Sequence, residues 1–346
     1  MQMTPSVQKP GASSDKHTLS KRRKDGPCMS KKSNSGAMGS SAPLKQRIYK
    51  YRGFYLMFLP VFIFTVVFFY LPMAGIGYAF TEYKGIKDPV FVGLENFRTM
   101  FSMPNFWSAF KNTLELSIIK LLLNTLLAVA ISLFLNEIIN IHYKKVVQTI
   151  IYLPHFMSWV VTASVFSLIL SPTGEGLVNS ILINLGVIQP GSEIYFLGST
   201  KWWRTAYYII NVWKDTGWGT IIFMATLSGI SPDLYEAGTI DGAGRWQKMR
   251  YITFPALKNT IITVLVLNLA KVMNLFESVF VLQNDAVMQQ SNVIQTYIYT
   301  QTFNSGAIPN YGYTTAVGLF KSLVGCVLVL TCNYISKKMR EGRGIV

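Results

Sequence analysis

The stretch FYLMFLPVFIFTVVFFYLPMAGIGYAF, residues 54–80, decides the class of fold. It has no charged side chain, and it is longer than the roughly 20 apolar residues that a helix needs to cross the hydrocarbon core of a bilayer. Pro60 and Pro72 are compatible with a membrane helix because neighbouring helices can satisfy the backbone groups that proline leaves free. The stretch therefore predicts a membrane-spanning helix.

Five further apolar segments follow it at residues 114–135, 146–170, 206–230, 260–282 and 313–335. Pro154 interrupts the third span, and Lys214 and Asp215 interrupt the fourth, so we expect these two spans to face protein or water. We predict an all-α integral membrane protein with six transmembrane helices. The transmembrane domain covers residues 51–336 and lies between a tail at 1–50 and a short tail at 337–346.

The composition supports a membrane protein. Half of the 346 residues are hydrophobic and 14% are charged, whereas soluble domains carry about 25% charged residues. The formal net charge of +16 comes from basic residues that lie between the apolar segments and not in one patch, which favours a membrane partner over nucleic acid. The spacing of the cysteines and histidines matches no metal or redox motif, so we expect no metal site. These residues are Cys28, Cys326, Cys332, His17, His142 and His155.

Positive charge in the loops predicts the orientation, since Lys and Arg resist translocation. Basic residues concentrate in the amino-terminal tail, after the second span, after the fourth span and in the carboxyl tail, while residues 283–310 contain none. Both termini are therefore expected in the cytoplasm of a multi-pass protein. The basic tail at 1–50, rich in Ser and Gly, is expected to be disordered and attracted to anionic lipid. It is not a secretory signal, and Met29 and Met38 leave room for a later start.

The loop between the fourth and fifth spans, ISPDLYEAGTIDGAGRWQKMRYITFPALKNT at residues 230–260, is too polar to cross a membrane. Ser231 is a good N-cap and Pro232 suits the first helical position, which predicts a helix over 232–240. Asp241-Gly242 predicts a turn, and a second helical piece is expected to run from Arg245 to a stop before Pro255. The loop at 231–256 therefore predicts a cytoplasmic helix-turn-helix.

Two interpretations of this loop remain open on composition alone. Leu234, Tyr235 and Ile240 offer an apolar face, and the small pair Ala237 and Gly238 allows close approach of another surface. The loop is either an amphipathic connector on the bilayer surface or a docking element for a cytosolic protein.

The loop resembles the signature of the binding-protein-dependent transport permeases: the chain reads EAG at 236–238, DGA at 241–243 and ITFP at 252–255. It departs from the usual pattern at Gly238, Met249 and Phe254, which changes only small or apolar positions. In such permeases the loop is a coupling helix that seats in an ATP-hydrolysing subunit, and the resemblance gives Glu236 the contact with the ATPase and Asp241 the turn. The residues carried over as coupling residues are Glu236, Ala237, Gly238, Asp241, Gly242, Ala243 and Pro255.

The resemblance also implies partners: a second permease subunit, giving a heterodimer, two ATP-binding subunits and an extracytoplasmic solute-binding protein at a bacterial inner membrane. The chain has no phosphate-binding Gly-x-x-x-x-Gly-Lys-Ser/Thr loop, so ATP and Mg are expected on the partner subunits, with no cofactor and no enzymatic activity on this chain. Four segments resemble the sugar and oligosaccharide branch of these permeases. They are Asn112-Thr113, Tyr152-Leu153-Pro154, Tyr70-Leu71-Pro72 with Ala79-Phe80, and residues 91–97.

Charged residues inside spans are costly and mark functional candidates. Trp213, Lys214, Asp215 and Trp218 combine aromatic faces, which stack on sugar rings, with groups that hydrogen-bond hydroxyls. In the fifth span, polar residues at helical spacing are expected on one face: Asn268, Lys271, Asn274 and Glu277. These eight residues are the candidates for the solute pathway, and the excess of lysines favours an anionic sugar.

The alternative is an internal salt-bridge network, with Lys214 or Lys271 paired with Glu277 and Lys321 able to join either arrangement. Glu115 and Lys120 are expected to snorkel at the outer end of the second span. Two rival functions would leave other marks in the sequence. An ion-coupled secondary transporter would show two related halves, and a membrane-embedded enzyme would show clustered His or acidic residues. The sequence shows neither feature.

Overall fold

The computed structural model describes residues 48–85, 88–173, 176–304, 306 and 308–339, and the regular secondary structure within these residues is helical apart from one short β-ribbon. The tails predicted at 1–50 and 337–346 lie mostly outside these residues. The chain divides after Thr65 into two units, and helix α2 (Arg52–Thr65), which buries none of its residues, belongs to the first.

The second unit continues as the π-helix η1 (Val66–Tyr70) and the 3₁₀-helix η2 (Leu71–Phe80), followed by the antiparallel ribbon β1 (Thr81–Glu82) and β2 (Val90–Phe91). The other elements follow in chain order: α3 (Glu95–Ser102), α4 (Pro104–Asn136), α5 (Ile141–Tyr152), η3 (Leu153–Phe156), α6 (Trp159–Ile169), α7 (Leu177–Asn184), α8 (Trp203–Leu227), α9 (Pro232–Ile240), α10 (Arg245–Lys248), η4 (Met249–Thr253), α11 (Phe254–Leu269), α12 (Glu277–Leu282), η5 (Asp285–Val287), α13 (Met288–Ser291), α14 (Ile294–Phe303) and α15 (Tyr311–Met339).

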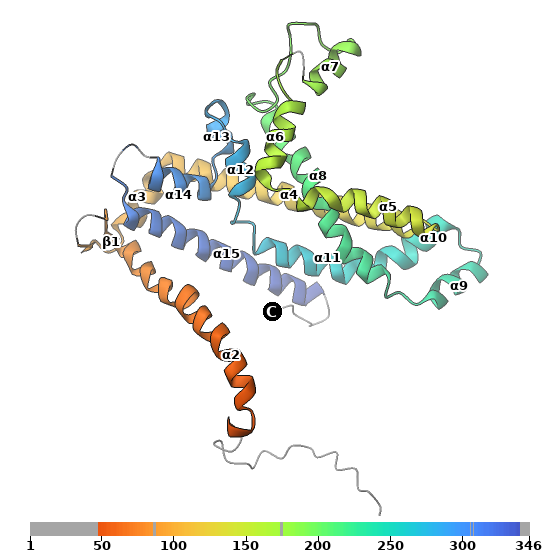
Figure 1. Ribbon diagram of the computed structural model, residues 1–346, viewed down its shortest axis with the longest axis horizontal. Helices are drawn as coiled ribbons and strands as arrows, with labels where there is room; N and C mark the ends of the chain where they lie inside the picture. The colour runs from red at the N-terminus through yellow and green to blue at the C-terminus, as the bar shows by residue number, and fades with distance from the viewer. Residues whose placement is uncertain (1–47, 86–87, 174–175, 305, 307, 340–346) are drawn as a thin grey trace, which may run out of the picture. The chain divides into compact units, whose positions relative to one another are not determined.

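Helix α4 is the centre of the second unit and packs along α8, while α11 packs against α4, α8 and α15 (Figure 1). Buried apolar residues at the carboxyl end of α4, such as Val129 and Leu135, meet Phe223 of α8 and Leu257 of α11. At the other end of α4, Phe106 and Ala109 pack with Ile294 of α14 and Val317 of α15. The helices are therefore joined at both ends by apolar contacts.

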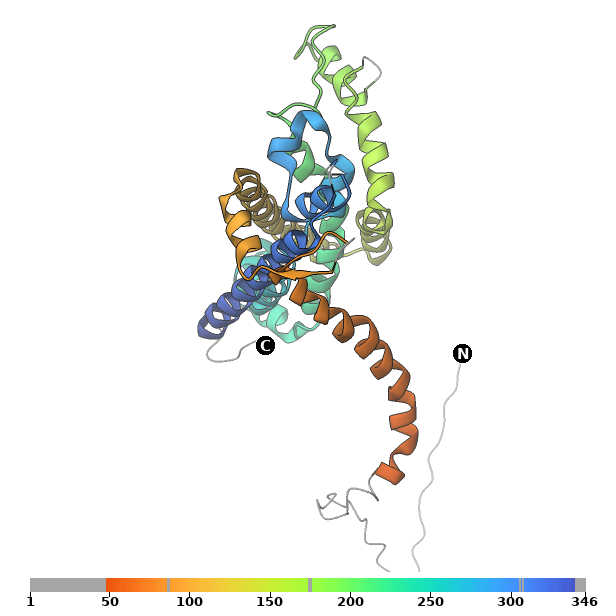
Figure 2. The ribbon, with the colours of Figure 1, turned by 90° about the vertical axis from the view of Figure 1, so that its left-hand side faces the viewer.

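The third predicted span is broken. Residues Ile141–Phe156, which comprise α5 and η3 with Pro154, meet α6 at an angle of 103°, and the break lies at Met157 and Ser158, whose backbones are extended. Figure 2 shows α6 leading away from the bundle toward α7. The N-cap Ser158 starts the second piece and accepts a hydrogen bond from the backbone N–H of Val161.

The described residues contain four helices that are long and apolar enough to cross a membrane: 52–80, 104–136, 245–269 and 311–338. The bent pair α5–α6 would be a fifth. Helix α8 is long enough but too polar to be counted, because Lys214 and Asp215 interrupt it. The all-α membrane class is therefore confirmed, and the count of six transmembrane helices is not.

The fifth predicted span, 260–282, is wrong as a single helix, although its last residue, Leu282, is also the last residue of a helix. The first helix starts earlier, at Phe254, and ends at Leu269; residues 270–273 form turns, residues 274–276 have no regular structure, and a separate short helix covers Glu277–Leu282. The side chain of Ser117 on α4 donates to the carbonyl oxygen of Val272 at 2.7 Å, so a partner on another helix satisfies one backbone group in this break.

Candidate coupling loop and translocation pathway

The first helix of the loop between α8 and α11 is capped as predicted. Helix α9 covers Pro232–Ile240, and the Ser231 hydroxyl accepts a hydrogen bond from the backbone N–H of Asp233. Pro232 occupies the first turn, where its missing N–H leaves no partner unsatisfied. Asp233 places negative charge at the positive end of the helix dipole. Local sequence alone therefore fixes where this helix begins.

The end of α9 is a Schellman turn centred on Gly242. The backbone N–H of Ala243 donates to the carbonyl of Gly238 at 2.8 Å, and that of Gly242 to the carbonyl of Thr239 at 3.0 Å. Gly242 has φ of 76°, in the left-handed region that residues with a Cβ adopt only at a cost. The position predicted as the turn thus requires glycine, and Asp241 beside it remains exposed.

The second helical piece does not stop before Pro255, so that prediction was wrong. Helix α10 runs into the π-turn η4, and α11 follows directly with Pro255 in its first turn. The wider π-turn, in which Phe254 donates to the carbonyl of Met249, admits a proline where an uninterrupted α-helix would exclude it. The loop is thereby joined rigidly to the apolar helix α11.

Gly238 serves the internal closure of the loop. A Cβ at this position would lie 3.2 Å from Cδ1 of Ile252, so α9 packs directly on η4. Two side-chain contacts hold the same pieces together: Lys248 Nζ donates to Thr239 Oγ1 at 2.7 Å, and the hydroxyls of Tyr235 and Thr253 lie 3.0 Å apart. Of the small pair expected to receive another surface, Ala237 alone is exposed.

The outer surface of the closed hairpin is apolar with acidic neighbours. Leu234, Ile240, Trp246 and Tyr251 are exposed, and Glu236 is exposed on the same short helix as Leu234 and Ile240. A separate contact anchors the hairpin to α4, because Arg245 donates from Nη2 to the Glu137 carbonyl at 2.6 Å and pairs with its carboxylate at 3.0 Å.

Within the bundle, Lys214 is almost fully buried, with 4% of its surface exposed. Its Nζ donates to the carbonyl oxygens of His155 at 3.0 Å and Met157 at 2.7 Å, and lies 5.3 Å from the centre of the Trp159 ring. The lysine therefore satisfies backbone carbonyls at the break between α5 and α6. Lys214 is therefore not paired with Glu277, as one prediction had it, and its ammonium group is not free to bind a solute.

Asp215 collects the other charges of this region, which we call the Asp215 cluster: Lys120, His155, Asp215 and Trp218. Lys120 Nζ and His155 Nδ1 each lie 3.5 Å from an oxygen of the Asp215 carboxylate, and the His155 ring stacks on Trp218 at 4.9 Å. Lys120 was expected to snorkel; the pair with Asp215 keeps it inside the bundle instead. The predicted internal salt-bridge network therefore exists, but it joins Lys120 and His155 to Asp215 and does not involve Glu277.

Aromatic surface remains open beside the Asp215 cluster. Trp218 is 50% exposed and Trp213 41% exposed, and the Trp213 ring makes a T-shaped contact with Phe166 of α6. The side chains of Lys120, Asp215 and His155 are also partly exposed. The cluster therefore offers both ring faces and hydrogen-bonding groups to a solute.

The polar residues of the fifth predicted span do not share a helical face. Asn268 lies in the last turn of α11, Lys271 and Asn274 lie in the break, and Glu277 begins α12. All four are exposed. The predicted ion pairs of Lys271 or Lys214 with Glu277 are not found among the described contacts.

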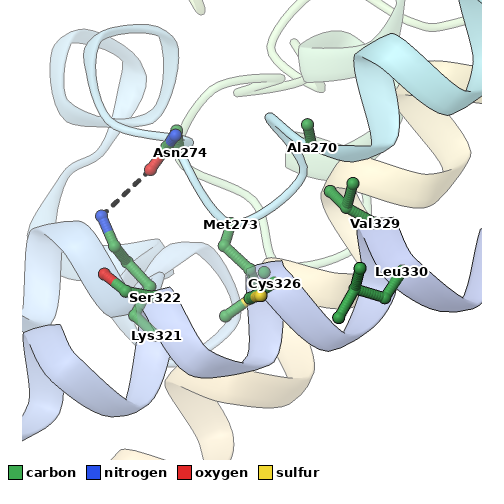
Figure 3. Close-up of a pocket in the computed structure, with 9 residues that line it drawn as sticks. Ala270, Met273, Asn274, Lys321, Ser322, Cys326, Val329 and Leu330 are labelled. Atoms are coloured by element: carbon green, nitrogen blue, oxygen red, sulfur yellow. Dashed lines mark hydrogen bonds between the residues drawn. The ribbon is translucent and has the colours of Figure 1, made fainter. Parts of the chain in front are cut away.

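A hollow of about 310 Å³ lies between this break and α15 (Figure 3). Asn274 faces it from the break and accepts a hydrogen bond from Lys321 Nζ at 3.0 Å. Cys326 and Val329 line it further along α15. Asn274 is therefore the one residue of the predicted set in the fifth span that the structure places, together with Lys321, at a hollow.

The sequence interpretation missed Arg204, in the first turn of α8. It forms an ion pair with Glu115 of α4, which was expected to snorkel. The available signal was a single charge directly after Trp202 and Trp203, which at a membrane interface is typical of an anchor. Nothing in the one-dimensional pattern indicates its partner 89 residues away.

The family model described as "Binding-protein-dependent transport system inner membrane component" matches residues 128–341, which include the capped loop and the Asp215 cluster apart from Lys120. The chain belongs to this family. The predicted resemblance is confirmed, and the protein is the membrane permease subunit of an ABC importer.

The permease is 39% identical over 291 residues to the "Polygalacturonan/rhamnogalacturonan transport system permease protein YteP" of Bacillus subtilis (strain 168), covering 83% of the permease and 88% of that protein. Its fold is similar to a chain in the crystal structure of a bacterial ABC transporter involved in the import of the acidic polysaccharide alginate. The TM-score is 0.78 at 36% identity, covering 85% of the permease and 98% of that chain.

A second solved structure, of a bacterial alginate ABC transporter in complex with alginate pentasaccharide-bound periplasmic protein, is equally similar. The TM-score is 0.78 at 35% identity, and the match covers 87% of the permease and 99% of that chain.

Proposed function

We propose that this permease forms half of the route by which a carboxylate-bearing oligosaccharide enters a bacterial cell, with transport driven by ATPase subunits that grip the loop at 231–256. The observation that carries the proposal is the closed, capped hairpin of α9 and α10. Its outer face is apolar, and it is fixed to α11 through η4 and to α4 through Arg245. Movement of the hairpin is thereby transmitted to two long helices.

The proposed partners are a second permease subunit, two ATP-binding subunits that carry ATP and Mg, and an extracytoplasmic solute-binding protein. The family description, which names binding-protein-dependent transport, supports the last of these. The absence of a phosphate-binding loop from the sequence supports hydrolysis on another chain. Glu236, which is exposed, is the proposed acidic contact to the ATP-binding subunit, and Asp241, the C-cap of α9, is proposed to hold the turn of the loop.

The proposed membrane is the bacterial inner membrane, with both termini and the hairpin in the cytoplasm. Support comes from basic residues, which concentrate in the loop with the hairpin and in the two tails. Attachment of a membrane-impermeant reagent to a cysteine introduced at the exposed Trp246 tests this orientation. Labelling from the outside of intact cells would contradict it.

The proposed substrate class rests on two observations. The first is the charge in and around the Asp215 cluster: Lys120 pairs with Asp215, the neighbouring Lys214, although buried, adds a second positive charge, and the rings of Trp213 and Trp218 are exposed beside them. Rings stack on sugars, and excess positive charge favours an anion. The second is that YteP and the alginate transporter are both named for acidic polysaccharides.

The test is ATP hydrolysis by the assembled transporter in proteoliposomes. A solute-binding protein loaded with an oligogalacturonate is expected to stimulate hydrolysis, and Glu236→Ala is expected to abolish the stimulation by weakening the hold on the ATP-binding subunits. Lys145→Gln, an exposed change in α5 outside the loop at 231–256, is the control. Solute accumulation by the permease without ATP-binding subunits would overturn the proposal.

A further inference from the structure

Arg204 lies at the end of the bundle opposite the coupling hairpin. Its partner Glu115 lies within helix α4, 11 residues after the first residue of that helix, Pro104, and the hairpin's partner Glu137 is the C-cap of the same helix. Their separation of 22 residues corresponds to about 33 Å along a helix. With the hairpin in the cytoplasm, Arg204 is at the outer end of the route.

The guanidinium of Arg204 is held by three groups. Nη1 pairs with the carboxylate of Glu115, and Nη2 donates to Asn112 Oδ1 at 2.9 Å and to the carbonyl of Gln290 at 3.4 Å. The side chains are only partly covered, with 28% of Arg204 and 35% of Glu115 exposed. A solute can therefore reach this pair without unfolding the helices.

The same residues close an outer segment of the chain onto α4. Asn112 donates from Nδ2 to the carbonyls of Gln289 and Asn292, each at 3.0 Å. The next residue, Thr113, accepts a hydrogen bond from the backbone N–H of Ile294 at 2.9 Å. Arg204 thus sits where α4, α8 and the segment before α14 meet.

Three buried hydrogen-bond donors in this region lack a partner among the described residues: Arg204 Nε, Tyr208 Oη and Gln290 Nε2. Tyr208 is one helical turn from Arg204, and Gln290 accepts from Arg204 through its own carbonyl. Buried donors are rarely left unpaired, so Nε of the guanidinium itself, the Tyr208 hydroxyl one turn along α8 and the side-chain amide of Gln290 in the adjoining segment call for a functional explanation. All three suit an incoming carboxylate.

We propose that Arg204 selects the carboxylate of the sugar at the outer end of the route, and that Glu115 holds its place until the sugar arrives. The carboxylate of an arriving uronate displaces that of Glu115 and forms a bidentate contact with the guanidinium. The Glu115 carboxylate then becomes solvated by water. A neutral sugar offers only hydroxyl and ether oxygens, which cannot displace a carboxylate. This inference rests on the proposed import of acidic oligosaccharides.

The site also leads toward the Asp215 cluster. Arg204 and Asp215 are 11 residues apart on α8, close to three full turns, so they lie on one side of the helix about 16 Å apart. Each pairs with α4, through Glu115 and Lys120. An acidic oligosaccharide thus meets basic groups at two levels along the same pair of helices.

The test compares an oligogalacturonate with its methyl ester of equal length, which has lost its charge. For each, the measurement is the concentration that half-maximally stimulates ATP hydrolysis by the assembled transporter with its solute-binding protein. We compare this concentration between variant and wild type for each probe. Both transporters use the same solute-binding protein, so its own preference for acid or ester cancels in the ratio. For Arg204→Gln we expect this concentration to rise about tenfold for the acid and to stay unchanged for the ester. For Glu115→Gln it should fall for the acid, because the competing carboxylate is gone.

The double variant Glu115→Gln/Arg204→Gln leaves no unpaired charge and should match Arg204→Gln. If Arg204→Gln fails to assemble, Arg204→Lys is the second variant, because it keeps the positive charge but lacks the planar guanidinium. The half-maximal concentration should then rise for the acid only, and by less than in Arg204→Gln. An equal effect of Arg204→Gln on both probes, or no effect on either, would overturn the inference. A wild-type transporter that responds to the ester but not the acid would instead overturn the proposed substrate class and the inference with it.

Discussion

The ammonium group of Lys214 lies 2.7 Å from the carbonyl oxygen of Met157, inside the break of the third predicted span. A second bond to the carbonyl of His155 and the ring of Trp159 complete its surroundings. A bend of 103° in a bilayer frees carbonyls that water cannot reach, and Lys214 satisfies two of them. The charged group of Lys214 therefore stabilises the bent backbone beside the pathway and does not contact a solute itself. Asp215 and Lys120, by contrast, are partly exposed.

Replacing this lysine is expected to destabilise the permease. Lys214→Met keeps the volume but leaves two carbonyls without a donor, and each unsatisfied buried group costs about 1–3 kcal/mol. We expect the assembled transporter to denature at a lower temperature and to lose roughly 2 kcal/mol or more of stability. The measurement is a thermal unfolding curve of the purified complex.

Lys271→Met is the matched control, because Lys271 is exposed in the break after α11. It should unfold close to the wild-type temperature. Equal stability of Lys214→Met and the wild type would show that the two carbonyls find other partners, and the role assigned to Lys214 would then be wrong.

Gly242 is the position in the hairpin where a side chain should be most harmful. Its φ of 76° costs a non-glycine residue about 1–2 kcal/mol, less for Asn than for Ala. Gly242→Ala should therefore reduce the amount of ATP-binding subunit that co-purifies with the permease, and Gly242→Asn should reduce it less. Gly244, with φ of −68°, is the control, since Gly244→Ala keeps an ordinary conformation. Equal loss in all three variants would contradict the explanation from backbone conformation.

The hairpin could be predicted from sequence because its signals are local. Ser231, Pro232 and Gly242 act within a few residues of themselves, and both the start and the turn of α9 lie where they were expected. The continuation through Pro255 was missed because a π-turn leaves no pattern in hydrophobic spacing.

The membrane helices could be predicted as apolar segments, and Pro154 marked the third span as interrupted, but the break after α11 could not be predicted. The end of α11 at Leu269 is accompanied by a bond from Ser117, 155 residues away, to the carbonyl of Val272. Likewise, Lys214 was recognised as a costly intramembrane charge, yet its partners are backbone carbonyls, which every residue has. Sequence identified the polar residues, and tertiary contacts decided their partners.

Close packing of Gly238 on Ile252 predicts a compensating pair of substitutions. Gly238→Ala requires a small shift of the flexible Ile252 Cδ1 and should be tolerated, whereas Gly238→Leu should force α9 away from η4 and weaken binding of the ATP-binding subunit. Adding Ile252→Ala should restore part of the binding lost in Gly238→Leu. The double-mutant cycle, measured by co-purification, checks this coupling. Strictly additive effects would show that the two positions do not press on each other.

Cys326 provides a probe of the hollow that it shares with Lys321 and Asn274 (Figure 3). If this hollow belongs to the solute pathway, it holds water in the assembled transporter, and a membrane-impermeant thiosulfonate should label Cys326 in a variant whose other two cysteines are serine. An anionic reagent should react several-fold faster than a cationic one because Lys321 lines the same hollow. Lys321→Gln should remove that difference in rate. Labelling of Cys326 only after detergent extraction would mean that lipid or the second permease covers this face, and Asn274 would then lose its place on the pathway.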